Sequence, residues 1–118
     1  MSGITQLHEV IMSVPKLTLL FRVEPGCLGP EGKQHIDTFC TLAMQVFPRL
    51  EPDLLNWEIV PRHDKKLDEM EFHLAGRRMS EDQADQYLHR AGCDLDHLKE
   101  RIDETLAMLV ERYLDSLP

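Results

Sequence analysis

Apolar and polar residues alternate along three short stretches of the chain, residues 17–23, 55–60 and 70–74. This alternation is typical of a β-strand with one buried face, because successive side chains of a strand point to opposite sides. One face of the three stretches is apolar throughout and comprises Leu17, Leu19, Phe21, Val23, Leu55, Trp57, Ile59, Met70, Phe72 and Leu74. The other face is mainly polar, and we expect Glu58, Glu69 and Glu71 to be exposed on it.

Apolar residues spaced three and four apart predict helices in the other segments. They indicate a short helix over residues 1–14, a second between the glycine-rich loop 24–32 and residue 47, a third over 80–91 and a long fourth over 94–117. A proline follows each of the first two, where a helix is disfavoured. Ser80 and Gln83 form a capping box for the third helix, Gly92 suits its end, and Asp94 caps the fourth.

These elements predict an α+β fold with a small three-stranded mixed sheet covered on one face by helices. The order is helix, strand, helix, strand, strand, helix, helix. The first two strands are parallel, because a helix connects them, and the third joins as an antiparallel strand. The 118 residues fit a single domain, 1–118, made of the N-terminal helix (1–14), a β-α-β-β unit (16–76) and a helical pair (80–117).

The last helix carries more apolar surface than one small domain needs. One stripe along it supplies a core face, and a second stripe lies beside the first towards the C-terminus. A helix that is apolar on more than one face is buried on more than one face. We therefore predict a homodimer whose interface comprises Leu106, Leu109, Val110, Tyr113, Leu114 and Leu117.

Composition narrows the classes of partner. The chain has 13 Lys and Arg against 21 Asp and Glu, a formal net charge of −8. Nucleic-acid binding normally depends on a basic surface, so this balance argues against it. Neither a secretory signal nor a membrane-spanning run is recognisable, and the three cysteines, Cys27, Cys40 and Cys93, are an odd number without a close pair. We expect a cytoplasmic protein without a disulfide framework and without membrane contact.

Two loops contain candidate catalytic and anion-binding residues at the carboxyl end of the parallel strands, where open α/β sheets place ligands. Loop 24–32 and hairpin loop 61–66 are expected to meet there. Cys27 near a helix start is a candidate nucleophile with His63 as its base, and Lys33, Arg62, Lys65 and Lys66 are candidate contacts for an anionic ligand. The alternative interpretation is an ordinary charged loop with an incidental cysteine, since no third group is identifiable to orient the histidine.

The corner between the last two helices contains a candidate metal site. His89, Cys93 and His97 recur every four residues, which on one unbroken helix would align three ligands. Gly92 and Asp94 indicate that the helix breaks there. We predict a buried cysteine with two surface histidines, and no metal or other cofactor.

No residue set in the chain completes a catalytic group. The leading hypothesis is therefore a small acidic, non-enzymatic regulatory or adaptor protein that acts through protein–protein interaction. The alternative is a small enzyme or anionic-ligand-binding protein that uses the two loops at the carboxyl end of the sheet.

Overall fold

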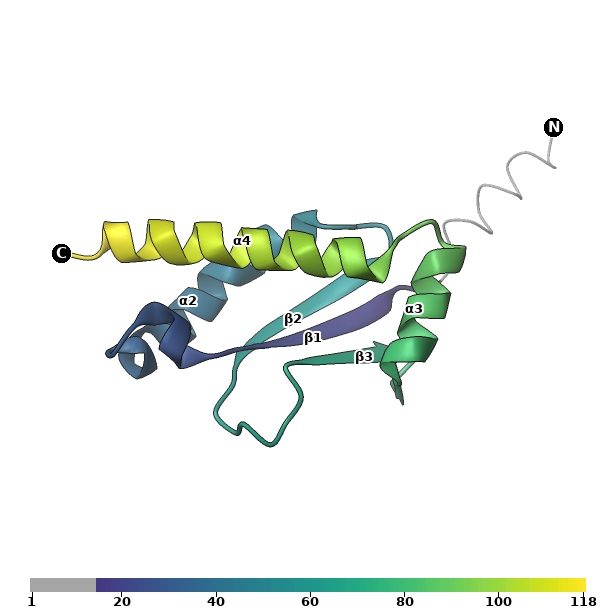
Figure 1. Cartoon of the computed structure of the whole chain (residues 1–118), viewed down its shortest axis with the longest axis horizontal. Helices are drawn as coiled ribbons and strands as arrows, with labels where there is room; N and C mark the ends of the chain where they lie inside the picture. The colour runs from purple at the N-terminus through teal and green to yellow at the C-terminus, as the bar shows by residue number, and fades with distance from the viewer. Residues whose placement is uncertain (1–14) are drawn as a thin grey trace.

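A computed structural model describes residues 15–118 of the chain (Figure 1). The helix predicted over residues 1–14 lies outside this range. The described elements are β1 (Leu17–Val23), the 3-10 helix η1 (Pro25–Leu28), α2 (Gly32–Val46), the 3-10 helix η2 (Phe47–Arg49), β2 (Leu55–Pro61), β3 (Met70–Leu74), β4 (Arg77–Met79), α3 (Glu81–Arg90) and α4 (Leu95–Ser116). The fold is α+β with a mixed sheet and a long C-terminal helix, as predicted.

The sheet has the strand order β2-β1-β3-β4. β1 and β2 are parallel, with Leu17 opposite Leu55, and α2 connects them. β3 is antiparallel to β1, with Leu19 opposite Phe72. β1 lies between β2 and β3, so Leu19 and Phe21 of its inward face each have a partner on both neighbouring strands.

The prediction of three strands was wrong, because β4 forms a fourth. A two-residue turn, Ala75 and Gly76, joins β3 to β4, and both residues have positive φ values of 51° and 79°. Two positive φ values are the requirement of a type I′ turn, the turn whose twist matches that of a β-hairpin. β4 was missed because its three residues, Arg-Arg-Met, show no hydrophobic alternation.

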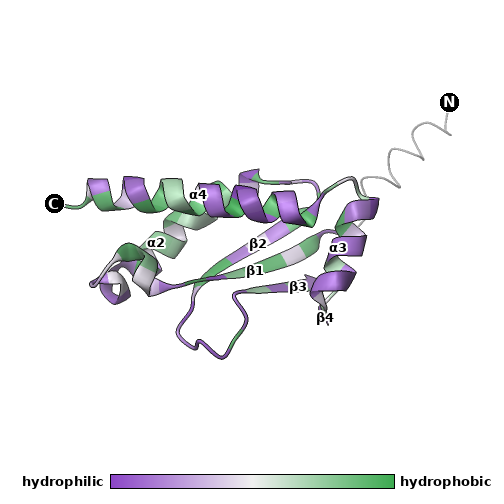
Figure 2. Ribbon diagram, in the orientation of Figure 1, coloured by the Kyte–Doolittle hydropathy of each residue, from purple (hydrophilic) through white to green (hydrophobic). Residues whose placement is uncertain are grey.

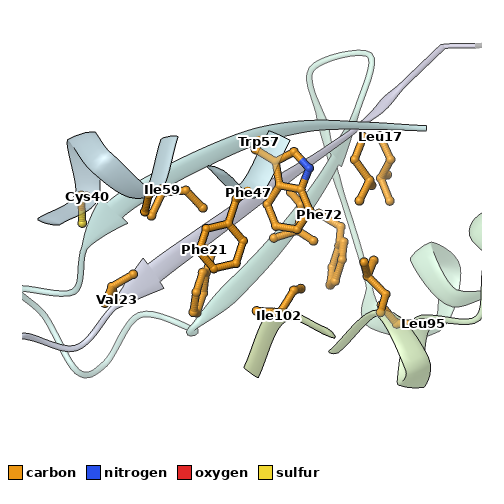
Figure 3. Packing of buried hydrophobic residues seen from close by; sticks show 14 of the residues in the cluster. Leu17, Phe21, Val23, Cys40, Phe47, Trp57, Ile59, Phe72, Leu95 and Ile102 are labelled. Atoms are coloured by element: carbon orange, nitrogen blue, oxygen red, sulfur yellow. The ribbon is translucent and has the colours of Figure 1, made fainter. Parts of the chain in front are cut away.

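The core lies on one face of the sheet, beneath α2 and α4. Phe21, Trp57 and Phe72 point from three strands toward Ile102 and Leu95 of α4 (Figure 3). Phe47 packs edge-on against Phe21, with ring centroids 5.8 Å apart. All of these side chains are buried, so the apolar face predicted from the alternation is the core face.

The local signals for the last two helices are confirmed. The Ser80 hydroxyl accepts a hydrogen bond from the Gln83 N–H, and the Gln83 side chain accepts one from the Ser80 N–H, which completes the capping box. The Asp94 carboxylate accepts from the Asp96 N–H at 3.1 Å at the start of α4. These caps satisfy helix N–H groups that have no partner within the helix.

Candidate functional site

The two loops at the carboxyl end of β1 and β2 do meet, and Arg62 joins them. The backbone N–H of Arg62 donates to the Val23 carbonyl at 2.8 Å, and its guanidinium lies 2.9 Å from the Glu24 carboxylate. The same guanidinium donates to the carbonyl oxygens of Lys65 and Leu67. The N–H donors of the Arg62 guanidinium therefore hold the hairpin loop in place. With these donors occupied, Arg62 is poorly placed to bind an anionic ligand.

The other predicted cations of this end are spread over the surface. Lys33, His63, Lys65 and Lys66 are all exposed, and neither of the two grooves described below is lined by any of them. Arg62 is thus the one predicted contact that the structure ties to loop 24–32.

Cys27 is half-buried in η1. Burial is the largest cause that shifts the pKa of its thiol, and it raises it; a backbone hydrogen bond opposes this, and the charge of the Glu24 carboxylate adds a smaller increase. A cysteine nucleophile needs the opposite, a lowered pKa that populates the thiolate near neutral pH. The surroundings of Cys27 therefore favour a packing role.

The start of α2 is closed against a phosphate. Gly32 N–H donates to the Gly29 carbonyl and Gln34 N–H donates to the Glu31 carbonyl, both at 3.0 Å. A phosphate-binding helix start needs such N–H groups free and pointing at the ligand. Gly32 is also pressed so closely against η1 that a Cβ there would lie 1.8 Å from the Pro25 carbonyl oxygen.

The corner between α3 and α4 has the predicted arrangement of its candidate ligands. Cys93 is buried, whereas His89 and His97 are exposed. Gly92 has a φ of 85°, which breaks the helix as expected. Within residues 15–118, no group of three or more His, Cys, Asp or Glu side chains is placed to hold a metal ion.

The C-terminal half of α4 lies beside α2, and apolar residues continue along it into its last turns (Figure 2). Tyr113, one of the predicted interface residues, is buried within the chain: its ring packs edge-on against Phe39 of α2, and its hydroxyl lies 3.2 Å from Nδ1 of His35. Four others pack partly buried against the core, namely Leu106, Leu109, Val110 and Leu117. Leu114 is 40 % exposed.

An apolar groove of about 260 Å³ runs between α2 and α4, and we call it the α2–α4 groove. It is lined mainly by Phe39, Leu42, Val46, Leu109 and Tyr113, with Gln45, Arg112 and Ser116 among the polar residues at its borders. Leu42 is 42 % exposed there. The stripe Leu106, Val110, Leu114 and Leu117 follows the adjacent flank of α4: these residues are spaced by four and three, and none of them lines the groove.

The polar face of the sheet contains a charged cluster that the alternation did not predict. Glu71, expected to be exposed, is 9 % exposed. Its carboxylate forms an ion pair with Arg22 of β1, lies 3.2 Å from Nε2 of His73 and 3.5 Å from Arg78 of β4. The hydrogen bond from Arg22 is the largest cause that holds the pKa of Glu71 below its usual value, followed, against the opposing effect of burial, by the Arg22 charge, His73 and Arg78.

A second groove, of about 590 Å³, lies along the outer edge of β3, and we call it the β3-edge groove. Its lining comes from four parts of the chain: residues 68–72, the end of β4, the start of α3 and one side of α4. Sequence reasoning missed it, because the groove exists only where β4 ends and the chain turns into α3. The one signal in the sequence was the capping box that follows Met79 so closely.

Comparison with known proteins gives no match: no family model, no curated protein and no solved structure is similar to this chain. No helix in the described part of the chain is both long and apolar enough to cross a membrane.

Proposed function

We propose that this protein is a small non-enzymatic regulatory or adaptor protein that acts through protein–protein interaction and forms a homodimer through the C-terminal half of α4. The observation that carries the proposal is the apolar surface left on that half of the helix. On one flank Leu109 lines the α2–α4 groove, and on the other Leu114 is 40 % exposed. Accessible apolar patches of this kind commonly mark interaction sites.

A second copy of the chain is the occupant that these surfaces fit. The outward side of α4 between the two flanks carries Glu104, Glu111 and Asp115, which would repel the same side of another copy. Packing by the flanks avoids this repulsion and covers both Leu42 and Leu114. A stable interface needs roughly 1,000 Å² in total, which two helices of this length with their neighbouring α2 residues can supply.

A non-enzymatic role is supported by the state of the candidate chemical groups. Arg62 is bound to Glu24 and to two carbonyl groups of its own loop, and burial raises the pKa of Cys27. Neither group is prepared for catalysis.

Light scattering on the full chain tests the dimer. We expect the wild type to have twice the chain mass of 13.7 kDa across a concentration series. Leu114→Glu places a charge in the interface and is expected to weaken the dimer at least about tenfold. Leu67→Glu is the matched control. Leu67 is 46 % exposed, like Leu114, but it lies in the loop between β2 and β3, outside both α2 and α4.

A wild type that stays monomeric at every concentration would overturn the dimer. So would a Leu114→Glu variant that dissociates no more readily than Leu67→Glu. Cooperative thermal unfolding of both variants establishes that both are folded when they are compared.

A further inference from the structure

The outer edge of the sheet is incomplete beside the first half of β3. β4 pairs only with Phe72, His73 and Leu74, and its last residue, Met79, lies opposite Phe72. Ser80 then caps α3, so the chain leaves the sheet where a longer strand would continue alongside Met70. The β3-edge groove occupies this position.

The hydrogen-bond ladder directs the backbone of Met70 into the groove. Arg22 N–H donates to the Glu69 carbonyl at 2.8 Å, so residue 69 directs its backbone groups toward β1. Backbone direction alternates along an antiparallel strand, and therefore the N–H and C=O of Met70 and Phe72 point to the outer side. Phe72 is opposite Met79 there, whereas Met70 is beyond the end of β4.

The lining of the groove is partly apolar and partly acidic. Met70, Phe72 and Met79 supply an apolar floor on the side of α4. Five carboxylates line the groove, Asp68, Glu69, Glu71, Glu81 and Asp103, against two cations, Arg78 and Lys99. Asp68 is paired with Arg78, Glu81 with Lys99 and Glu71 with Arg22. Among residues 15–118, Glu69 and Asp103 form no ion pair, so the groove has an uncompensated negative charge.

We propose that the β3-edge groove binds an extended basic segment of a partner protein, which adds to the sheet as a strand beside Met70. Such a segment would form main-chain hydrogen bonds with Met70, place an apolar side chain beside Met70 and Phe72, and place basic side chains near Glu69 and Asp103. Strand addition at an open edge is an established way of binding peptides. A second copy of this chain fits poorly, because its own carboxylates would be brought against Glu69 and Asp103.

This inference rests on the proposed function and specifies the partner of an adaptor. It is independent of the α4 dimer, since the β3-edge groove and the α2–α4 groove share no lining residue.

The test uses the full chain, labelled with ¹⁵N, and a blocked synthetic peptide of alternating lysine and valine as the probe. We expect the peptide to shift the amide resonances of Met70 and Phe72 and to slow hydrogen exchange at the Met70 amide. The same peptide with N-methylated valines loses main-chain donors and is expected to bind at least about fivefold more weakly. A glutamate–valine peptide is expected not to bind.

Charge reversal locates the site. Glu69→Lys is expected to weaken the lysine–valine peptide about fivefold, since an attractive cross-strand pair becomes repulsive. Glu58→Lys is the matched control: it makes the same change at an exposed glutamate of the same polar face, on the far edge strand β2. Asp103→Lys and its neighbour Glu104→Lys form a second pair, because only Asp103 lines the groove.

Unchanged Met70 and Phe72 resonances would overturn the proposal. Equal binding of the N-methylated peptide would do the same, because it would mean contact by charge alone. Equal affinity in Glu69→Lys and Glu58→Lys would place the peptide elsewhere. Repeating the titration with Leu114→Glu separates the two proposals: loss of the dimer with peptide binding intact contradicts neither the groove nor its occupant.

Discussion

The loops at the carboxyl end of β1 and β2 and the outer edge of β3 differ in how completely their polar groups are used. At the carboxyl end, Arg62 bonds to Glu24 and to loop carbonyls, and the Gly32 and Gln34 N–H groups at the start of α2 already have partners. At the β3 edge, the Met70 backbone faces a groove, and the carboxylates of Glu69 and Asp103 form no ion pair in the described part of the chain.

In these two regions, the type of a residue and its availability for binding are therefore separate properties. The carboxyl-end loops contain the side chains that most resemble a catalytic or anion-binding set. The donors of Arg62 are used in internal contacts, and such contacts stabilise the loop at the expense of binding. The remaining cations, Lys33, His63, Lys65 and Lys66, are exposed and line neither groove. The β3 edge contains common residue types, yet its backbone and carboxylates are available to a partner.

The largest expected effect tests how tightly the carboxyl end is packed. Gly32→Ala places a Cβ 1.8 Å from the Pro25 carbonyl oxygen and 2.7 Å from its carbon, so η1 must move away from α2. We expect a loss of about 3 kcal/mol in the free energy of unfolding, measured by urea denaturation. Gly26→Ala is the control, because nothing lies within 4 Å of its Cβ position, and a change below about 0.5 kcal/mol is expected. Equal stabilities of the two variants would show that the loop yields freely.

An intermediate effect is expected at the β3 edge. Glu71→Gln removes a charge that Arg22, His73 and Arg78 surround, and we expect it to lower the free energy of unfolding by about 1–2 kcal/mol at pH 7. Glu69→Gln, at an exposed neighbouring carboxylate, is expected to change it by less than about 0.5 kcal/mol.

The pH dependence of this variant gives a second measurement. The folded-state pKa of Glu71 lies below its ordinary value of 4.5, so its contribution to stability is present above that value and is lost as the pH falls through the lowered folded pKa. The stability difference between wild type and Glu71→Gln is therefore expected to be largest near neutral pH and to shrink in acid. A stability difference that stays constant down to pH 2 would show that Glu71→Gln acts through altered packing, not through the lost charge.

The smallest effect concerns the reactivity of Cys27. Because burial raises the pKa of its thiol, we expect iodoacetamide to modify Cys27 at pH 7.5 at least about threefold more slowly in the folded protein than in urea. Peptide mapping by mass spectrometry distinguishes it from Cys40, whose pKa burial raises to about 11, and from the buried Cys93. Faster modification in the folded protein would contradict the packing role of Cys27 and support a role as a nucleophile.

Much of the fold was predictable, because strong local patterns and the tertiary structure agree. The sequences of β1, β2 and β3 alternate between apolar and polar residues, and Ser80 and Gln83 cap α3 as their spacing indicates. β4 was not predictable from hydrophobicity, since three residues are too few to show a period. The turn residues Ala75 and Gly76 were the better signal for it, because glycine suits the second position of a type I′ turn.

The burial of Glu71 depends on partners that are distant in the sequence. Alternation assigned its side chain to the polar face correctly, but its exposure is decided by Arg22, 49 positions earlier, and by Arg78 from the missed strand. The β3-edge groove has the same origin, because it depends on the strand order and on where β4 stops. Features built from several segments are inaccessible to reasoning about one segment at a time.

The uncompensated carboxylates of the β3-edge groove also bear on colloidal behaviour. Exposed sheet edges are templates for aggregation, and proteins protect them with charges that repel another copy of the same edge. Glu69 and Asp103 stand beside the one stretch of β3 that β4 leaves uncovered. The same negative charge that would select a basic partner therefore keeps identical molecules from joining edge to edge into fibrils.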